Sequence, residues 1–181
     1  MTFSTTFRAA FFASATLLGT AAMAAQALVP AQSSINFTAK QMGVPLQGQF
    51  KKFDAQVSFD TAKPETSKIH FTVETGSATM GSKETDSNLL GADWFNIAKF
   101  PKATFDSTAV KALGGGKYQV EGTLTIKGSA QKVSLPVTLT QSGATTTATG
   151  TLALKRLNFK IGDGDWKDTS MVADEVNVQF K

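Results

Sequence analysis

The chain has 181 residues, no cysteine, and a formal net charge of +4 from 18 basic and 14 acidic side chains. This length is typical of one domain, or of one domain with a short appendage, and an apolar content of 41% is sufficient for a packed core. The absence of cysteine excludes a disulfide framework, a cysteine-ligated metal and a thiol nucleophile. The single histidine, His70, excludes a histidine-rich metal site and disfavours a histidine-dependent triad.

Residues 1–24 have the pattern of a secretory signal peptide. Arg8 precedes an apolar run, and a small-x-small cleavage pattern ends at Ala24. The run is shorter than the roughly 20 residues that a membrane-spanning helix needs. We therefore expect cleavage after Ala24, with cleavage after Ala27 as the alternative, export to the periplasm, and a mature domain over residues 25–181.

The remaining charges and apolar residues are dispersed. The densest basic sites are two pairs, Lys51-Lys52 and Lys155-Arg156. Nucleic-acid binding requires a stripe of positive charge interleaved with aromatic residues, so no nucleic-acid partner is expected. No apolar run of membrane length follows the leader, so we expect no integral membrane segment in the mature chain.

Apolar residues recur at every second position along the mature chain. The clearest run is VSLPVTLT at residues 133–140, and such alternation is typical of strands with one buried face. Short glycine-containing connections, such as Gly114-Gly115-Gly116, predict hairpins and hence an antiparallel sheet. The predicted strands are 33–40, 45–53, 55–60, 67–75, 102–110, 117–126, 131–141, 145–155 and 174–180. Eight or nine such strands suit one barrel or sandwich, and an eight-stranded barrel holds side chains only or one small ligand.

One stretch between strands departs from the alternation. Ser82 is an N-cap candidate ahead of Thr85 and Asp86, and Gly91 is a stop signal. A short helical excursion is therefore predicted near residues 82–95.

Several segments, in the same order, resemble the YceI family of bacterial periplasmic proteins. They include GQFKKFDA at 48–55, DWF at 93–95, KFPKATF at 99–105 and GTLTIKG at 122–128, and the likeness spans about residues 28–181. The resemblance implies an all-β, extended lipocalin-like antiparallel eight-stranded β-barrel. It also implies an apolar tunnel that binds a polyisoprenoid or a similar amphiphile, such as a quinone, a prenyl pyrophosphate or a fatty amide.

The resemblance has one departure, and it suggests how a carrier of this kind would open. Many members of the family have an Arg-Asp pair where this chain has Thr85-Asp86. If that arginine places a polar head group, the change predicts a preference for a neutral or differently charged one. A carrier must also release its cargo, and we expect the segment 82–95 to act as the gate.

The phase of the strands selects the side chains that would line such a tunnel. The candidate lining residues on strands are Phe37, Val57, Phe59, Phe71, Phe105, Leu124, Ile126, Leu135, Leu152 and Leu154. Trp94, outside the regular strands, is a further candidate that lines the mouth of the barrel or else plugs its end. Arg156, the one arginine after the leader, is the candidate for head-group contact, or else it pairs with a carboxylate at a barrel end. The alternative is a filled core, which would give a non-catalytic structural or stress-related periplasmic barrel without lipid cargo.

Other chemistry is not supported by the sequence. Asp163, Asp165 and Asp168 suggest a calcium loop, but Lys167 stands where an EF-hand needs a ligand, so no metal is expected. Nucleophile-elbow and phosphate-loop motifs are absent, and we predict a binding protein rather than an enzyme, with no cofactor besides the lipid ligand. The oligomeric state stays open, a homodimer included.

Overall fold

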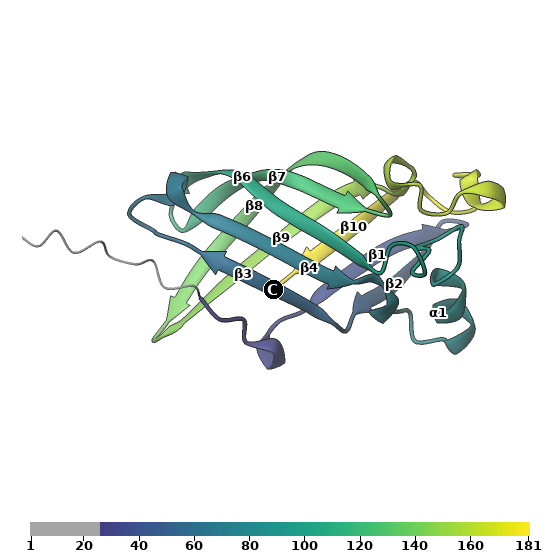
Figure 1. The fold of residues 1–181 in the computed structure, drawn as a ribbon, viewed down its shortest axis with the longest axis horizontal. Coiled ribbons are helices and arrows are strands. Elements are labelled where there is room, and N and C mark those ends of the chain that lie inside the picture. The colour runs from purple at the N-terminus through teal and green to yellow at the C-terminus, as the bar shows by residue number, and fades with distance from the viewer. Residues whose placement is uncertain (1–25) are drawn as a thin grey trace, which may run out of the picture.

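The structure is a computed structural model that describes residues 26–181, so the predicted signal peptide lies outside the described residues. Ten strands form one antiparallel sheet in the order β3-β4-β6-β7-β8-β9-β10-β1-β2-β5, and the sheet curls into a half-barrel (Figure 1). The strands are β1 (Ile35–Gln41), β2 (Val44–Phe50), β3 (Phe53–Ser58), β4 (Lys68–Glu74), β5 (Ala78–Thr79), β6 (Lys102–Gly114), β7 (Lys117–Ile126), β8 (Ser129–Ser142), β9 (Thr145–Lys155) and β10 (Glu175–Phe180). The helices are α1 (Lys83–Leu89) and the short 3-10 turns η1 (Pro30–Gln32), η2 (Pro64–Thr66), η3 (Thr75–Ser77), η4 (Arg156–Phe159) and η5 (Gly164–Lys167).

The predicted all-β, antiparallel, lipocalin-like fold class is confirmed. Each of the nine strands expected from alternation corresponds to a strand of the sheet. The sheet has ten strands and not eight. Nine of them follow the predicted alternation, and the tenth, β5, has only two residues and is too short to show a period. The strand expected over 45–53 ends at Phe50, since Lys51 and Lys52 form the corner between β2 and β3.

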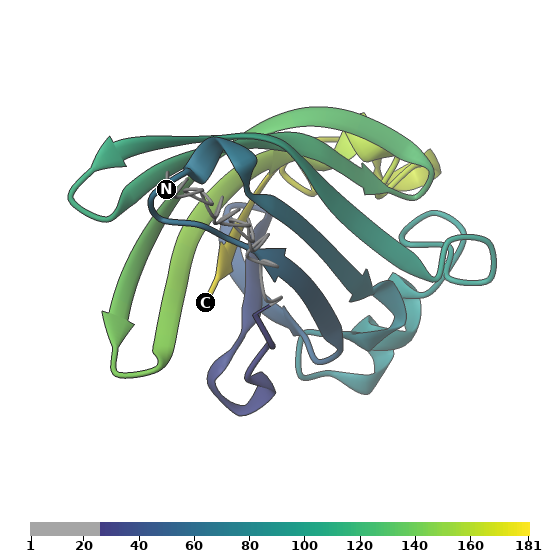
Figure 2. The same cartoon turned by 60° about the vertical axis from the view of Figure 1, so that its left-hand side comes forward.

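The sheet is curled but its ladder has two ends, at β3 and β5. Within residues 26–181 no strand pairing joins these ends. The segment before β1 lies along the β3 edge instead: the Gln26 backbone N–H donates to the Val57 carbonyl at 2.8 Å, and Gln26 Nε2 donates to the Phe59 carbonyl at 3.0 Å. Figure 2 shows this segment, in purple, running from the β3 edge to the start of β1.

Glycines inside the sheet provide room for aromatic rings on its inner face. Gly48 is the cross-strand partner of Phe37, and an added Cβ there would lie 2.2 Å from the ring. Gly150 is the partner of Phe180, and a Cβ would lie 2.4 Å from that ring. The two rings therefore lie flat over the strands, in space that no other residue type would leave.

The predicted helical excursion is confirmed as α1, and its start is held by side chains. The Ser82 Oγ accepts a hydrogen bond from the Thr85 N–H at 3.5 Å, as an N-cap does. The Asp86 carboxylate accepts from Thr79 Oγ1 at 2.6 Å and from the Met80 N–H at 2.7 Å. These two hydrogen bonds hold the pKa of Asp86 below its usual value. Among residues 26–181, no helix is long and apolar enough to cross a membrane.

Candidate functional site

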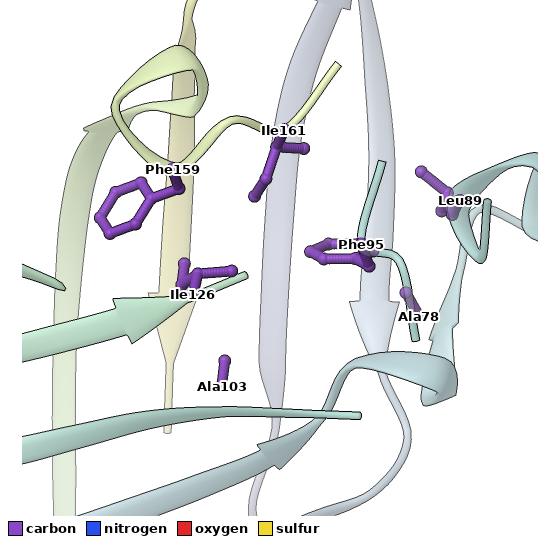
Figure 3. Close-up of a cluster of buried hydrophobic side chains, with 7 residues drawn as sticks. All are labelled: Ala78, Leu89, Phe95, Ala103, Ile126, Phe159 and Ile161. Carbon is purple, nitrogen blue, oxygen red and sulfur yellow. The ribbon is translucent and has the colours of Figure 1, made fainter. Parts of the chain in front are cut away.

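The inner face of the curled sheet is apolar along its length. One cluster of buried side chains lies at the end where α1 and the loops meet the sheet; its members are Ala78, Leu89, Phe95, Ala103, Ile126, Phe159 and Ile161 (Figure 3). A second cluster, formed by Phe105, Val110, Val120 and Leu135, lies on β6, β7 and β8. Leu124 packs against both clusters, so they form one continuous apolar surface.

Many side chains on this inner face keep part of their surface open to solvent. Val110 and Val120 are each 2% exposed, as expected inside a filled core. By contrast, the inner-phase residues of β4, β9 and β10 are only half-buried; they are Ile69, Phe71, Val73, Leu152, Leu154, Val176, Val178 and Phe180. The sheet therefore presents a strip of apolar side chains that its own core covers only in part.

Most of the predicted lining residues lie together on this face. Trp94, Ile126 and Leu154 belong to or pack against the first cluster, Phe59, Phe71, Phe105, Leu135 and Leu152 belong to or pack against the second, and Leu124 touches both. Phe37 is buried with its ring 5.4 Å from that of Phe50. Val57 is half-buried on β3, opposite Ile69 of β4. Whether a ligand contacts these residues stays a prediction.

Several important members of the first cluster were not among the predicted lining residues. Phe95 and Leu89 belong to the helical excursion, and Phe159 and Ile161 belong to the late turn at η4. Alternation could not select them because they lie outside strands. The available signal was composition alone, since large apolar residues in a turn are frequently buried.

The two loop regions at this end are joined through the backbone of Asp93. The Asp93 carbonyl accepts from the N–H groups of Gly162 and Asp163 at 2.8 and 3.0 Å, and from Lys127 Nζ at 3.1 Å. Lys127 Nζ also donates to the Lys160 carbonyl at 2.6 Å, and burial lowers the pKa of this lysine. The Trp94 and Trp166 rings pack alongside in a tilted arrangement, with their centroids 5.5 Å apart and their planes at 54°. These contacts close the barrel end against which the first cluster packs.

The Arg156 side chain joins several backbone segments at the same closed end of the barrel. It is 2% exposed, and all five guanidinium N–H groups donate to backbone carbonyls at 2.7–3.1 Å. The acceptors are Ile161, Gly162, Trp166, Val172 and Ala173. Burial lowers the pKa of Arg156, while the nearby Asp174 and Asp163 raise it. In this structure no N–H of Arg156 is left for a lipid head group, so the head-group role expected for it is not carried into the proposed function.

The outer face of the sheet is polar, as the alternation predicts. His70 faces outward with its side chain 41% exposed, and its Nδ1 lies 2.6 Å from an Asp106 carboxylate oxygen. Across residues 26–181, no group of three or more His, Asp or Glu side chains is placed to hold a metal ion. The inner face is therefore the part of the described chain with the chemistry of a site, and that chemistry is apolar.

A curled antiparallel sheet with an apolar inner face and one end closed by loops defines a lipocalin-like fold. A family model described as "YceI-like domain" matches residues 27–181, and the chain belongs to this family. A "UPF0312 protein" of Yersinia pestis (strain Pestoides F) is 38% identical over an alignment of 157 residues, and the match covers 81% of each chain.

Solved structures share the fold. The crystal structure of Burkholderia cenocepacia BcnA has a TM-score of 0.82 and 47% identity, and the match covers 84% of this chain and 96% of that one. A polyisoprenoid binding domain from Saccharophagus degradans, implicated in plant cell wall breakdown, has a TM-score of 0.64 and 17% identity, covering 86% and 93%. At that identity the second likeness shows the fold alone.

Proposed function

We propose that this protein is a periplasmic carrier that binds the tail of a polyisoprenoid, or of a similar long-chain amphiphile, against the inner face of its sheet. The observation that carries the proposal is the strip of half-buried apolar side chains on β4, β9 and β10. Membership of the YceI-like family and the fold shared with a polyisoprenoid binding domain support it. The predicted signal peptide supports the location.

The proposed mechanism is partitioning of an apolar chain out of water. Each 100 Å² of apolar surface removed from water contributes about 2.5 kcal/mol, and both the tail and the strip lose exposed surface when they meet. This interaction requires no hydrogen-bonding partner for the tail. Binding, rather than catalysis, is therefore the activity that the inner face supports.

A direct experiment tests the proposal. The protein is purified without detergent and extracted with organic solvent, and the extract is analysed by mass spectrometry. We expect a lipid in a stoichiometric amount, or stoichiometric uptake of added polyprenyl compounds by the delipidated protein. No lipid and no uptake would favour the filled core of a structural protein.

Substitutions locate the tail on the strip. Leu152→Trp adds volume to the half-buried inner face of β9, and Phe71→Trp does the same on β4. Both should reduce uptake severalfold while the far-UV circular dichroism of the sheet is retained. Leu113→Trp is the matched control, because Leu113 is 62% exposed at the end of β6. Equal uptake by all three variants would mean that the tail binds elsewhere.

A further inference from the structure

Three exposed apolar side chains lie together at the tip of the β1–β2 hairpin. They are Met42, Val44 and Met171, which are 70%, 60% and 43% exposed. The Met42 backbone N–H donates to the Met171 carbonyl at 2.8 Å, and this bond joins the hairpin turn to the loop after η5. Figure 1 shows β1 and β2 reaching the same end of the molecule as α1. We call these three residues the apolar tip.

The hairpin turn does not have the residue that its backbone favours. Gln41 pairs with Val44, so two residues form the turn, and both have a positive φ, 48° at Met42 and 80° at Gly43. A turn of this kind favours Asn-Gly or Asp-Gly, because asparagine and aspartate tolerate a left-handed backbone. Methionine is disfavoured there, and a side chain that is 70% exposed gains little from packing. A local rule broken without a gain in the fold is expected at a functional site.

The backbone of the tip is held in place although its side chains are exposed. Gln41 and Val172 form an isolated β-bridge, and Arg156 Nη2 donates to the Val172 carbonyl at 2.7 Å. In the loop, the Ser170 N–H and Oγ both donate to Asp168 Oδ1, at 2.8 and 2.7 Å. The fold therefore presents these apolar side chains to the outside in a defined position.

The size and shape of the tip fit a lipid surface better than a protein. β5 pairs with β2 only at Gln49 and Phe50, so among residues 26–181 no strand pairs with this edge of β2 near Val44. A stable protein interface buries about 800 Å² and about 20–30 residues on each partner, far more than three side chains at a hairpin tip. A bilayer requires no complementary shape, since each apolar side chain that leaves water contributes by itself.

The charges around the tip do not favour an anionic surface. Lys167 lies 3.6 Å from Asp163, while Asp165, Asp168 and Lys40 are exposed. These side chains carry two positive charges against three negative ones. Attraction to acidic phospholipids therefore does not explain the tip, and insertion of its apolar side chains is the interaction that it offers.

We propose that the apolar tip inserts into the interfacial region of a lipid bilayer and docks the protein reversibly on a membrane. The proposal goes beyond the proposed function and does not depend on it, because docking requires no cargo. Methionine suits this role, since its flexible and polarisable side chain adapts to irregular apolar surroundings. Trp166 of η5 packs against Trp94, so a docked tip would also bring the predicted gate at 82–95 close to lipid.

The test measures co-sedimentation of delipidated protein with vesicles of phosphatidylcholine, whose head group has no net charge. Mass spectrometry first confirms that the predicted signal peptide is absent, because its apolar run would bind vesicles by itself. The tip variants are Met42→Asn, which restores a favoured turn residue, and Met42→Trp, which adds an aromatic ring suited to the membrane interface. The matched controls are Leu113→Asn and Leu113→Trp, because Leu113 is 62% exposed at the end of β6.

We expect the wild type to bind the vesicles, Met42→Asn to bind about tenfold more weakly, and Met42→Trp to bind severalfold more tightly. A tenfold loss corresponds to roughly 60 Å² of apolar surface that no longer enters the lipid. The thermal unfolding temperature of Met42→Asn should not fall, since asparagine suits this turn, so misfolding would not account for the loss. Both Leu113 variants should bind as the wild type does, and added salt should leave binding unchanged.

Several results would overturn the proposal and leave the proposed function untouched. They are equal effects at positions 42 and 113, binding that salt abolishes, and no binding by either the wild type or Met42→Trp. Sedimentation velocity tests a second copy of the chain as the partner. If Met42→Asn changes the oligomeric state while vesicle binding is unchanged, the tip is an interface between copies and the bilayer is refuted as its partner.

Discussion

Replacing Arg156 should destabilise the protein more than replacing any lysine of its surface. The five hydrogen bonds of this guanidinium join the start of η4 to the turn that follows it and to the chain before β10. Methionine has a similar length but no donor, so Arg156→Met leaves five carbonyls of a buried region without their partner. A buried polar atom that loses its partner costs about 1–3 kcal/mol. Water entering the end of the barrel would offset part of the total cost of the five unpaired carbonyls. We expect a decrease in the free energy of unfolding of at least about 4 kcal/mol.

Urea unfolding followed by far-UV circular dichroism and by tryptophan fluorescence measures the effect. Trp166 reports on the region directly, because its carbonyl accepts from Arg156. Lysine has three N–H donors instead of five, so Arg156→Lys should lower the free energy of unfolding by about 2–4 kcal/mol. This variant allows the effect to be measured if Arg156→Met does not fold. Lys155→Met, at the exposed neighbouring position, is the control and should change stability by less than about 0.5 kcal/mol. A folded Arg156→Met protein within about 1 kcal/mol of the wild type, at an unchanged urea dependence, would refute this account.

Three further predictions concern the packing and the helix. Gly150→Ala should lower the free energy of unfolding by about 1–3 kcal/mol, because the new Cβ would meet the Phe180 ring. Gly76→Ala is the control and should be near neutral, since its Cβ would meet the Ile97 side chain at an ordinary 3.6 Å. Thermal unfolding of both variants measures the difference. The lowered pKa of Asp86 means that its ionised form stabilises the folded state, so the difference in unfolding free energy between wild type and Asp86→Asn should be present at pH 7 and disappear as the pH falls below 3.8 through the folded-state pKa. If the segment 82–95 is the gate, its amide hydrogens should exchange faster than those of the strands and slow down when lipid is added; protection equal to that of the strands in both states would contradict the gate.

The strands were predictable because one physical constraint acts on each of them separately. A strand with one face in water must alternate, and the run at 133–140 does so with Ser134, Pro136, Thr138 and Thr140 at the exposed positions. The helix α1 was predictable for a similar reason, because Ser82 and Gly91 are local signals for its start and stop. The same local reasoning placed most of the lining residues on one face.

Features that depend on distant contacts were not predictable from the pattern. Arg156 gave no sign that five carbonyls from residues 161–173 would surround it, because backbone acceptors have no sequence signature. In the sequence Lys51 and Lys52 are only a basic pair, whereas in the structure they line a cleft whose other walls include residues of η1, β4 and β6. Closure of the barrel also depends on whether β3 and β5 meet, which alternation does not specify.

The two ends of the ladder have a consequence for the size of cargo that the sheet can enclose. In a closed barrel, a larger circumference requires every ladder to shift or break, because each strand is bonded on both sides. Here, among residues 26–181, the backbone bonds along the outer edge of β3 come from one segment, through Gln26. Rotation of β3 and β4 away from β2 would therefore widen the interior at the expense of very few hydrogen bonds. The width of the interior is therefore set by side-chain packing and not by a closed ladder, and under the proposed function the same sheet would accept tails of different thickness.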